Sequence, residues 1–196
     1  MSARERIPPG QGVTKGWPIL HFGPVRDVPR EAWDLRVIGA IERELRLSWD
    51  ELQRLPRVRV TADFHCVTGW SHLDATWEGF AVGELLRRAG ARIDRAPNGS
   101  AANGGFVRFF DGGVYDTTVP MEVALGEDVL LADREGGAPL SAERGGPLRG
   151  VVPSLYGWKS CKWVRVIEVL REEQLGFWEV RGYANGADPW REQRLI

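Results

Sequence analysis

Residues 63–71 read Asp63-Phe64-His65-Cys66-Val67-Thr68-Gly69-Trp70-Ser71, and they place a cysteine shortly after an alternating stretch that predicts a β-strand over residues 57–61. The glycine and serine that follow the cysteine loosen the backbone, so we expect a loop at Trp70. A thiol at the end of a strand is held by the sheet and still reaches a neighbouring cleft. Cys66 is therefore the first candidate for a reactive or metal-ligating residue.

A second run lies far away in the sequence. Residues 148–153 predict a buried strand, and the run Tyr156-Gly157-Trp158-Lys159-Ser160-Cys161-Lys162-Trp163 follows it as a loop. A glycine, a hydroxyl and two lysines on one loop are typical of an anion-binding site. The alternative is a solvated basic face. Arg149 argues against that alternative, because it interrupts an apolar strand and a buried guanidinium needs a partner.

Composition places the chain among ordinary globular proteins. It has 196 residues, 43% of them hydrophobic and 27% charged, with a net charge of −1, so we expect one domain and no nucleic-acid partner. The sequence contains no apolar stretch of the ~20 residues that a membrane span requires. The N-terminus lacks an apolar signal segment and a twin-arginine pair, so we expect a cytoplasmic protein. Two cysteines give no disulfide framework, and two buried thiols are the alternative to a functional one.

Patterning predicts an α+β fold with mostly antiparallel or mixed sheets and short helices. Residues 1–30 are rich in proline and glycine and predict an extended arm, which leaves 31–196 as a single domain. Ser48 and Glu51 form a capping box for a short helix, and a second helix begins near Val82. We expect strands over 34–41, 106–110, 114–119, 129–132 and 163–169, long polar loops over 94–105 and 133–146, and an aromatic tail folded back onto the domain.

Local motifs exclude several kinds of active site. The sequence has no Gly-x-Ser-x-Gly, no His-Glu-x-x-His, no phosphate loop and no dinucleotide fingerprint. Three histidines leave few ligands for a zinc or iron site. Cys66 remains the candidate reactive centre, and thiolates act both as ligands of soft metals and as nucleophiles. On a strand, the adjacent His65 points to the opposite face, which disfavours a cysteine hydrolase.

The two runs resemble the sulfite-oxidase-type molybdopterin-binding domain, and the similarity covers residues 17–190, nearly the whole chain. Residues 64–71 are similar to the segment around the molybdenum-ligating cysteine of that family, and 146–153 to its Pro-Val-Arg-x-Val-Val-Pro strand. Residues 156–163 are similar to its Tyr-Gly-Phe-Lys loop, 182–185 to its tail, and 21–25 to its Asn-His-x-Pro-Val-Pro entry segment. The small bacterial sulfite oxidase-like oxidoreductases are the most similar group.

The resemblance implies a role for each matching residue. Cys66 would ligate molybdenum, and Tyr183 would border the metal as a second catalytic residue. Cofactor contacts would come from these residues: His21, Phe22, Thr117 (or Thr118), Arg144, Arg149, Ser160, Cys161 and Lys162. Ser160, Cys161 and Lys162 would act partly through backbone groups. The sequence departs from family sulfite oxidases in one respect, because residues 67–71 contain no arginine to grip an anion.

The resemblance implies a molybdenum–molybdopterin oxidoreductase that transfers an oxygen atom to or from a small sulfur-containing substrate, by sulfite oxidation or sulfoxide reduction. We expect neither a haem domain before it nor a dimerisation domain after it, so electrons would pass to a separate haem or flavin protein. Two other hypotheses remain: a non-catalytic molybdopterin-binding or carrier module, and a cofactor-free interaction domain with buried cysteines.

Overall fold

The structure, a computed structural model, describes residues 3–91 and 105–196. Within these ranges the strands form a six-stranded and a five-stranded sheet, and the helices are short. The first sheet contains β1 (Gly12–Val13), β4 (Val58–Cys66), β5 (Trp70–Ala81), β8 (Leu130–Glu135), β9 (Ala138–Pro139) and β10 (Arg149–Val151). The second contains β2 (Asp34–Gly39), β3 (Leu45–Ser48), β6 (Phe106–Phe110), β7 (Asp116–Pro120) and β11 (Val166–Leu170).

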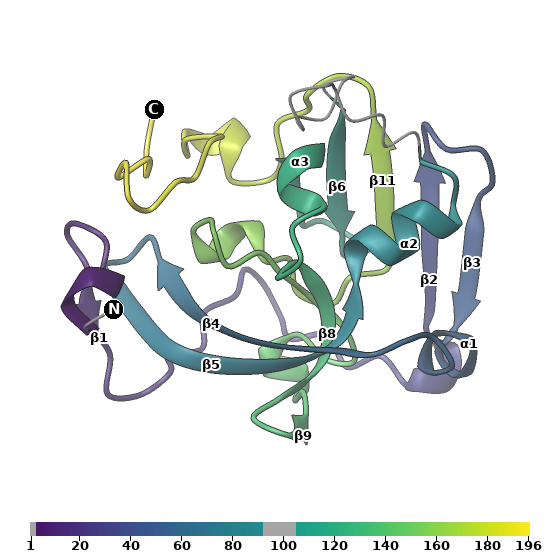
Figure 1. Ribbon diagram of the computed structural model, residues 1–196, viewed down its shortest axis with the longest axis horizontal. Helices are drawn as coiled ribbons and strands as arrows, with labels where there is room; N and C mark the ends of the chain where they lie inside the picture. Colours follow the sequence, from purple (N-terminus) through teal and green to yellow (C-terminus); the bar gives the residue numbers. More distant parts are fainter. Residues whose placement is uncertain (1–2, 92–104) are drawn as a thin grey trace.

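The helices are α1 (Trp49–Gln53), α2 (Val82–Arg88) and α3 (Met121–Ala124), and the 3-10 turns are η1 (Ala3–Arg6), η2 (Arg30–Ala32), η3 (Ala142–Arg144), η4 (Gly157–Lys159) and η5 (Glu179–Arg181). In Figure 1 the second sheet stands at one end of the molecule, and the long β4–β5 hairpin runs beneath the rest. Most neighbouring strands are antiparallel, whereas β2–β11 and β1–β5 are parallel. These mixed sheets with short helices confirm the predicted α+β class.

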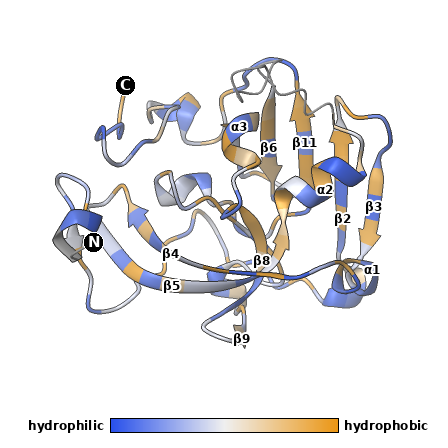
Figure 2. Cartoon of the chain, in the orientation of Figure 1, coloured by the Kyte–Doolittle hydropathy of each residue, from blue (hydrophilic) through white to orange (hydrophobic). Residues whose placement is uncertain are grey.

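Local signals place several elements where the sequence predicts them. The Ser48 hydroxyl accepts from the amide of Glu51 and the Glu51 carboxylate accepts from the amide of Ser48, so the capping box of α1 is complete. In α2 the side chains of Val82, Leu85 and Leu86 are buried, as the helical spacing of apolar residues predicts. Figure 2 shows the hydrophobic colour concentrated on β2, β6 and β11, around which the larger of two hydrophobic clusters forms.

The prediction of a loop at Trp70 is wrong. Residues 66–69 form a tight turn, closed by a 3.0 Å hydrogen bond from the Gly69 amide to the Cys66 carbonyl, and β5 begins at Trp70. Gly69 has a φ of 97°, which favours glycine. Pairing with β4 along nearly its whole length holds β5 extended, although its sequence does not alternate cleanly.

Two further boundaries differ from expectation. The polar loop predicted over 133–146 contains the end of β8, a hairpin to β9 and η3, because Gly136 and Gly137 both take positive φ and reverse the chain within two residues. The strand predicted from Trp163 begins at Val166, because Trp163 has a φ of 54° that no strand allows. The loop expected over 94–105 lies outside the described residues except for Gly105.

Both ends of the chain return to the β4–β5 hairpin (Figure 1). β1 pairs in parallel with the start of β5, and Trp17 packs 5.6 Å from Phe64 and 5.3 Å from Trp77. The tail runs back past η5 to the same end of the molecule (Figure 1), where Arg194 donates to the Val67 carbonyl. Among the described helices, none is long and apolar enough to cross a membrane.

Candidate active site

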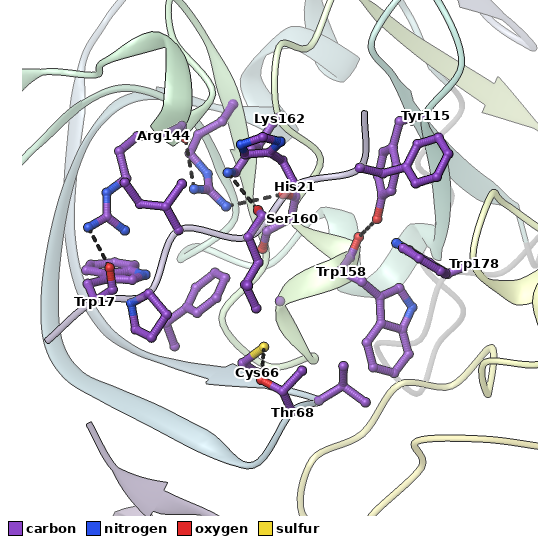
Figure 3. A pocket seen from close by; sticks show the side chains of 18 of the residues that line it. Trp17, His21, Cys66, Thr68, Tyr115, Arg144, Trp158, Ser160, Lys162 and Trp178 are labelled. Atoms are coloured by element: carbon purple, nitrogen blue, oxygen red, sulfur yellow. Dashed lines mark hydrogen bonds between the residues drawn. The ribbon is translucent and has the colours of Figure 1, made fainter. Parts of the chain in front are cut away.

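A pocket of about 220 Å³ opens between the N-terminal arm, the turn after β4 and the loop that follows β10. Both sequence runs therefore line one cavity. In Figure 3 the Cys66 sulfur points into the space between these segments, with Lys162 and Ser160 across from it. The lining residues are Trp17, Pro18, Ile19, Leu20, His21, Phe22, Phe64, Cys66, Val67, Thr68, Trp70, Tyr115, Arg144, Arg149, Gly157, Trp158, Ser160, Lys162, Trp163, Trp178 and Tyr183.

Cys66 ends β4 and is half-buried. Its Sγ lies 3.1 Å from the Thr68 hydroxyl, on the turn that closes the hairpin. The neighbouring His65 does not line the pocket; its Nδ1 lies 2.8 Å from the Ser71 hydroxyl, and burial lowers its pKa. The alternation of side chains along β4 separates the thiol from the imidazole, so His65 cannot act as its base.

Arg149 is the buried cation of the pocket, and only 3% of it is exposed. Its guanidinium donates to the carbonyls of Arg144 (3.0 Å) and Ser160 (3.3 Å) and lies 5.1 Å above the Trp77 ring. Among the described residues, no carboxylate forms an ion pair with it. Burial lowers its pKa to about 10, so it remains charged at neutral pH. A buried charge of this kind attracts an anion into the pocket.

Lys162 and Arg144 add two more cations beside Arg149. The Lys162 ammonium donates to the carbonyls of Leu20 (2.8 Å) and Glu143 (2.6 Å). Burial, together with the charges of Arg149 and Arg144, lowers its pKa to about 7. Arg144 donates to the Trp17 carbonyl (3.1 Å). Because these contacts are mostly with neutral carbonyls, the cluster keeps an excess of positive charge.

Aromatic rings form the wall of the pocket on the side away from Arg144 (Figure 3). Trp158 lies 5.1 Å from the Tyr183 ring at a near-perpendicular angle, and Trp178 lies 5.0 Å from the same ring. The Tyr115 hydroxyl donates to the Trp158 carbonyl (2.5 Å) and fixes the start of this wall. The Cys66 end of the pocket is therefore apolar and aromatic, while the cations gather at the other end.

A fully buried ion pair stands behind the aromatic wall. The Lys159 ammonium lies 2.6 Å from Glu179 Oε1, with neither side chain exposed. The same oxygen accepts from the Trp158 indole (3.1 Å) and the Thr117 hydroxyl (3.1 Å). The pair therefore joins η4 to η5 and fixes the ring of Trp158.

The predicted site residues divide into two groups. Cys66, Tyr183, His21, Phe22, Arg144, Arg149, Ser160 and Lys162 line the pocket. Thr117 and Cys161 do not. The Thr117 hydroxyl is buried against Glu179, and the Cys161 thiol is fully buried in the larger hydrophobic cluster, which raises its pKa. Thr118, the alternative to Thr117, is also buried outside the pocket. Cys161 therefore has only its backbone groups with which to contact the cofactor.

Sequence reasoning missed Thr68, Tyr115 and Trp178 as lining residues. Thr68 belongs to the first run and its hydroxyl beside the thiol follows from the tight turn, which was not expected. Tyr115 and Trp178 lie outside both runs. Their only signal was the aromatic content of the segments around them, which core packing explains equally well.

A family model described as the oxidoreductase molybdopterin binding domain matches residues 22–178, most of the chain. This chain belongs to the sulfite-oxidase-type molybdopterin-binding family. It is 39% identical to the uncharacterized oxidoreductase YuiH of Bacillus subtilis, over 97% of this chain and 92% of that one. It is 29% identical to the putative protein-methionine-sulfoxide reductase subunit YedZ1 of Azospira oryzae, over 90% of this chain and 65% of that one.

Larger family members match over part of their length. The sulfite oxidase of Arabidopsis thaliana is 28% identical over 83% of this chain, which spans 48% of that relative. The sulfane dehydrogenase SoxCD of Paracoccus pantotrophus shares the fold, with a TM-score of 0.61 and 22% identity over 76% of this chain and 40% of that one. The molybdopterin-binding domain is thus an oxidoreductase, with Mo-molybdopterin as its cofactor.

The residues present fit this cofactor. A half-buried thiol at one end of the pocket is a suitable ligand for molybdenum, because its thiolate form is a soft metal ligand. A buried guanidinium without a carboxylate partner among the described residues suits the phosphate of the pterin at the other end. Rings of Trp17, Trp163 and Phe64 also line the pocket, next to the cations, and suit a planar heterocycle.

Proposed function

We propose that this domain transfers an oxygen atom to or from a small sulfur-containing substrate, with the Cys66 thiolate as the protein ligand of molybdenum. The observation that carries the proposal is that Cys66 and the Arg149–Lys162 loop, far apart in sequence, share one pocket. When bound, the molybdenum–pterin group supplies the two-electron chemistry. The protein supplies the binding, orientation and electrostatics.

Each group of residues has a distinct part in this proposal. Arg149, Lys162 and Arg144 bind the phosphate, and each charged hydrogen bond is worth ~1.5–3 kcal/mol. Ser160 and its neighbours contribute backbone groups, while His21 and Phe22 cover the pocket from the arm. The Tyr183 hydroxyl donates a hydrogen bond to the oxygen that is transferred, and the aromatic wall excludes water from the substrate. Electrons pass to or from a separate haem or flavin protein.

For the substrate, we propose a neutral sulfoxide that is reduced. The Cys66 end of the pocket is lined by Val67, Thr68 and Trp70, and among the described residues none of these neighbours of the thiol is a basic side chain that could hold a sulfite dianion. The name of the Azospira oryzae relative, a putative methionine-sulfoxide reductase subunit, supports this direction. Sulfite oxidation is the second candidate, supported by the name of the Arabidopsis thaliana relative.

Metal analysis of the purified full-length protein tests the proposal, with Cys66→Ser as the decisive variant. We expect molybdenum in the parent and loss of turnover of sulfoxide with an artificial electron donor in Cys66→Ser. Cys161→Ala removes the other thiol, which lies in the hydrophobic core, and should retain turnover. An active parent without molybdenum would overturn the assignment. A molybdenum-loaded parent that turns over neither sulfoxide nor sulfite would favour a cofactor carrier instead.

A further inference from the structure

The turn that carries Cys66 is held from outside the pocket by both ends of the chain. The Gln11 side-chain amide donates to the Cys66 carbonyl (3.0 Å), and the Gly12 amide donates to the Gly69 carbonyl (2.9 Å). From the C-terminal tail, Arg194 Nη1 donates to the Val67 carbonyl (2.6 Å). These bonds satisfy three carbonyls of a four-residue turn, so the turn depends on segments distant in sequence.

Arg194 joins these segments. Its Nη2 donates to the carbonyls of Pro9 (3.4 Å) and Gly10 (3.3 Å), so a single guanidinium bridges the Cys66 turn and the N-terminal segment. Its charge also lies 5.4 Å above the ring of the buried Tyr156. In the part of the chain that the structure describes, no carboxylate pairs with it, and it does not line the pocket. The guanidinium fork is rigid, so it fixes the relative positions of the carbonyls it binds.

The backbone around Arg194 reaches the other candidate catalytic residue. Its carbonyl accepts from the Ala184 amide (3.1 Å), the next residue forms a β-bridge with Tyr183, and the Ile196 amide donates to the Gly182 carbonyl (3.0 Å). The Arg194 side chain therefore holds the turn of Cys66 while its backbone holds the segment of Tyr183.

We propose that Arg194 is a positioning residue, which fixes the Cys66 turn and sets its distance from Tyr183. The catalytic part of this inference rests on the proposed function. Without the guanidinium, the Val67 carbonyl loses its partner and the N-terminal segment loses its connection to the tail. The turn then opens more often, and the Cys66 thiol spends less time oriented into the pocket.

Hydrogen exchange of the Gly69 amide tests directly whether Arg194 holds the turn, because the hydrogen bond of this amide closes the turn. In the cofactor-free full-length chain, Arg194→Ala should raise this exchange rate about tenfold or more, as expected for loss of one charged hydrogen bond. Arg194→Lys keeps one donor and a charge and should restore part of the protection. Arg191→Ala is the matched control, since Arg191 lies on the same tail and pairs with Asp188 on that tail rather than with the Cys66 turn. Equal exchange in Arg194→Ala and Arg191→Ala overturns the proposal.

In the molybdenum-loaded enzyme, Arg194→Ala should lower kcat while KM changes little, because the substrate-facing side chains are unaltered. The electron paramagnetic resonance spectrum of the one-electron-reduced metal should shift, and Arg194→Lys should move it back toward the parent. An unchanged spectrum together with an unchanged kcat overturns the catalytic role. Loss of the proposed function is distinguishable, since it would leave the parent without molybdenum while the exchange result still stood.

Discussion

Lys159 and Lys162 are three residues apart in the same loop, yet their environments are opposite. Lys159 is fully buried and paired with Glu179, and it also donates to the Thr118 carbonyl (2.8 Å) and to Asn185 (3.0 Å). Lys162 borders the pocket beside Arg149, and within residues 3–91 and 105–196 its hydrogen bonds go to two backbone carbonyls. A lysine whose charge is neutralised by a buried carboxylate has a structural role. One that faces other cations is available to an anion.

The largest expected effect comes from breaking the buried pair. Glu179→Gln keeps an oxygen for Trp158 and Thr117 but leaves the Lys159 ammonium buried without a counter-charge. We expect a loss of about 3–5 kcal/mol in the free energy of unfolding, measured by urea denaturation. Lys162→Met is the comparison and should change that free energy by less than ~1 kcal/mol, because it removes a cation from a basic cluster.

The control for this prediction is the double variant Lys159→Met/Glu179→Gln. It removes both charges and retains the acceptor, so most of the lost stability should return. If Lys162→Met destabilises the protein as much as Glu179→Gln does, the two lysines do not differ in the way their contacts indicate.

Arg149→Met should have the next largest effect, on cofactor retention. The variant keeps an apolar side chain against the rings of Phe64 and Trp77 but removes the buried charge. Loss of one charged contact should lower the molybdopterin affinity about tenfold or more. Pterin content after exhaustive dialysis measures this. Full retention of the pterin would show that the phosphate does not bind at this end of the pocket.

The lowered pKa of Lys162 makes anion binding depend on pH. Its folded-state pKa of about 7 lies below the ordinary value of 10.5, so the ammonium loses its proton as the pH rises through about 7. The cost of burying the charge is present below that pH and is relieved above it, so stability should rise with pH between about 7 and 10.5. Sulfate keeps its charge over this range and is a suitable probe.

For the cofactor-free chain, sulfate binding should therefore weaken as the pH rises through about 7, and isothermal titration calorimetry can follow it. Lys162→Met should bind sulfate weakly at every pH and lose the transition. A transition that persists in Lys162→Met would assign the titrating group elsewhere.

Thr117→Val is expected to have the smallest effect. It removes one neutral hydrogen bond to Glu179, and the free energy of unfolding should fall by ~1 kcal/mol. Because Thr117 does not line the pocket, molybdenum content should not change. Reduced molybdenum content in a folded Thr117→Val protein would indicate that Thr117 contributes to cofactor binding after all.

Local chemistry explains which parts of the fold were predictable. The capping box of α1 and the apolar face of α2 each depend on neighbouring residues, so the sequence was sufficient to predict them. The strand β5 was missed because pairing with β4 and β8, rather than its own pattern, holds it extended. The expectation at Thr117 was a pocket contact, but its hydroxyl bonds to a carboxylate from the tail.

The sequence by itself determined the family, through the resemblance of its two runs, and it singled out Cys66 as the proposed molybdenum ligand and the loop that carries the basic residues, because these features are local in the sequence. Only the tertiary structure decided which lysine is neutralised by a carboxylate and which donates to backbone carbonyls, since Glu179 reaches Lys159 from a distant turn. It also decided how the Cys66 turn is held, through Gln11 from one end of the chain and Arg194 from the other. The physical reason is the same in both cases: partners for buried charges and turn carbonyls come from whichever segments folding brings together.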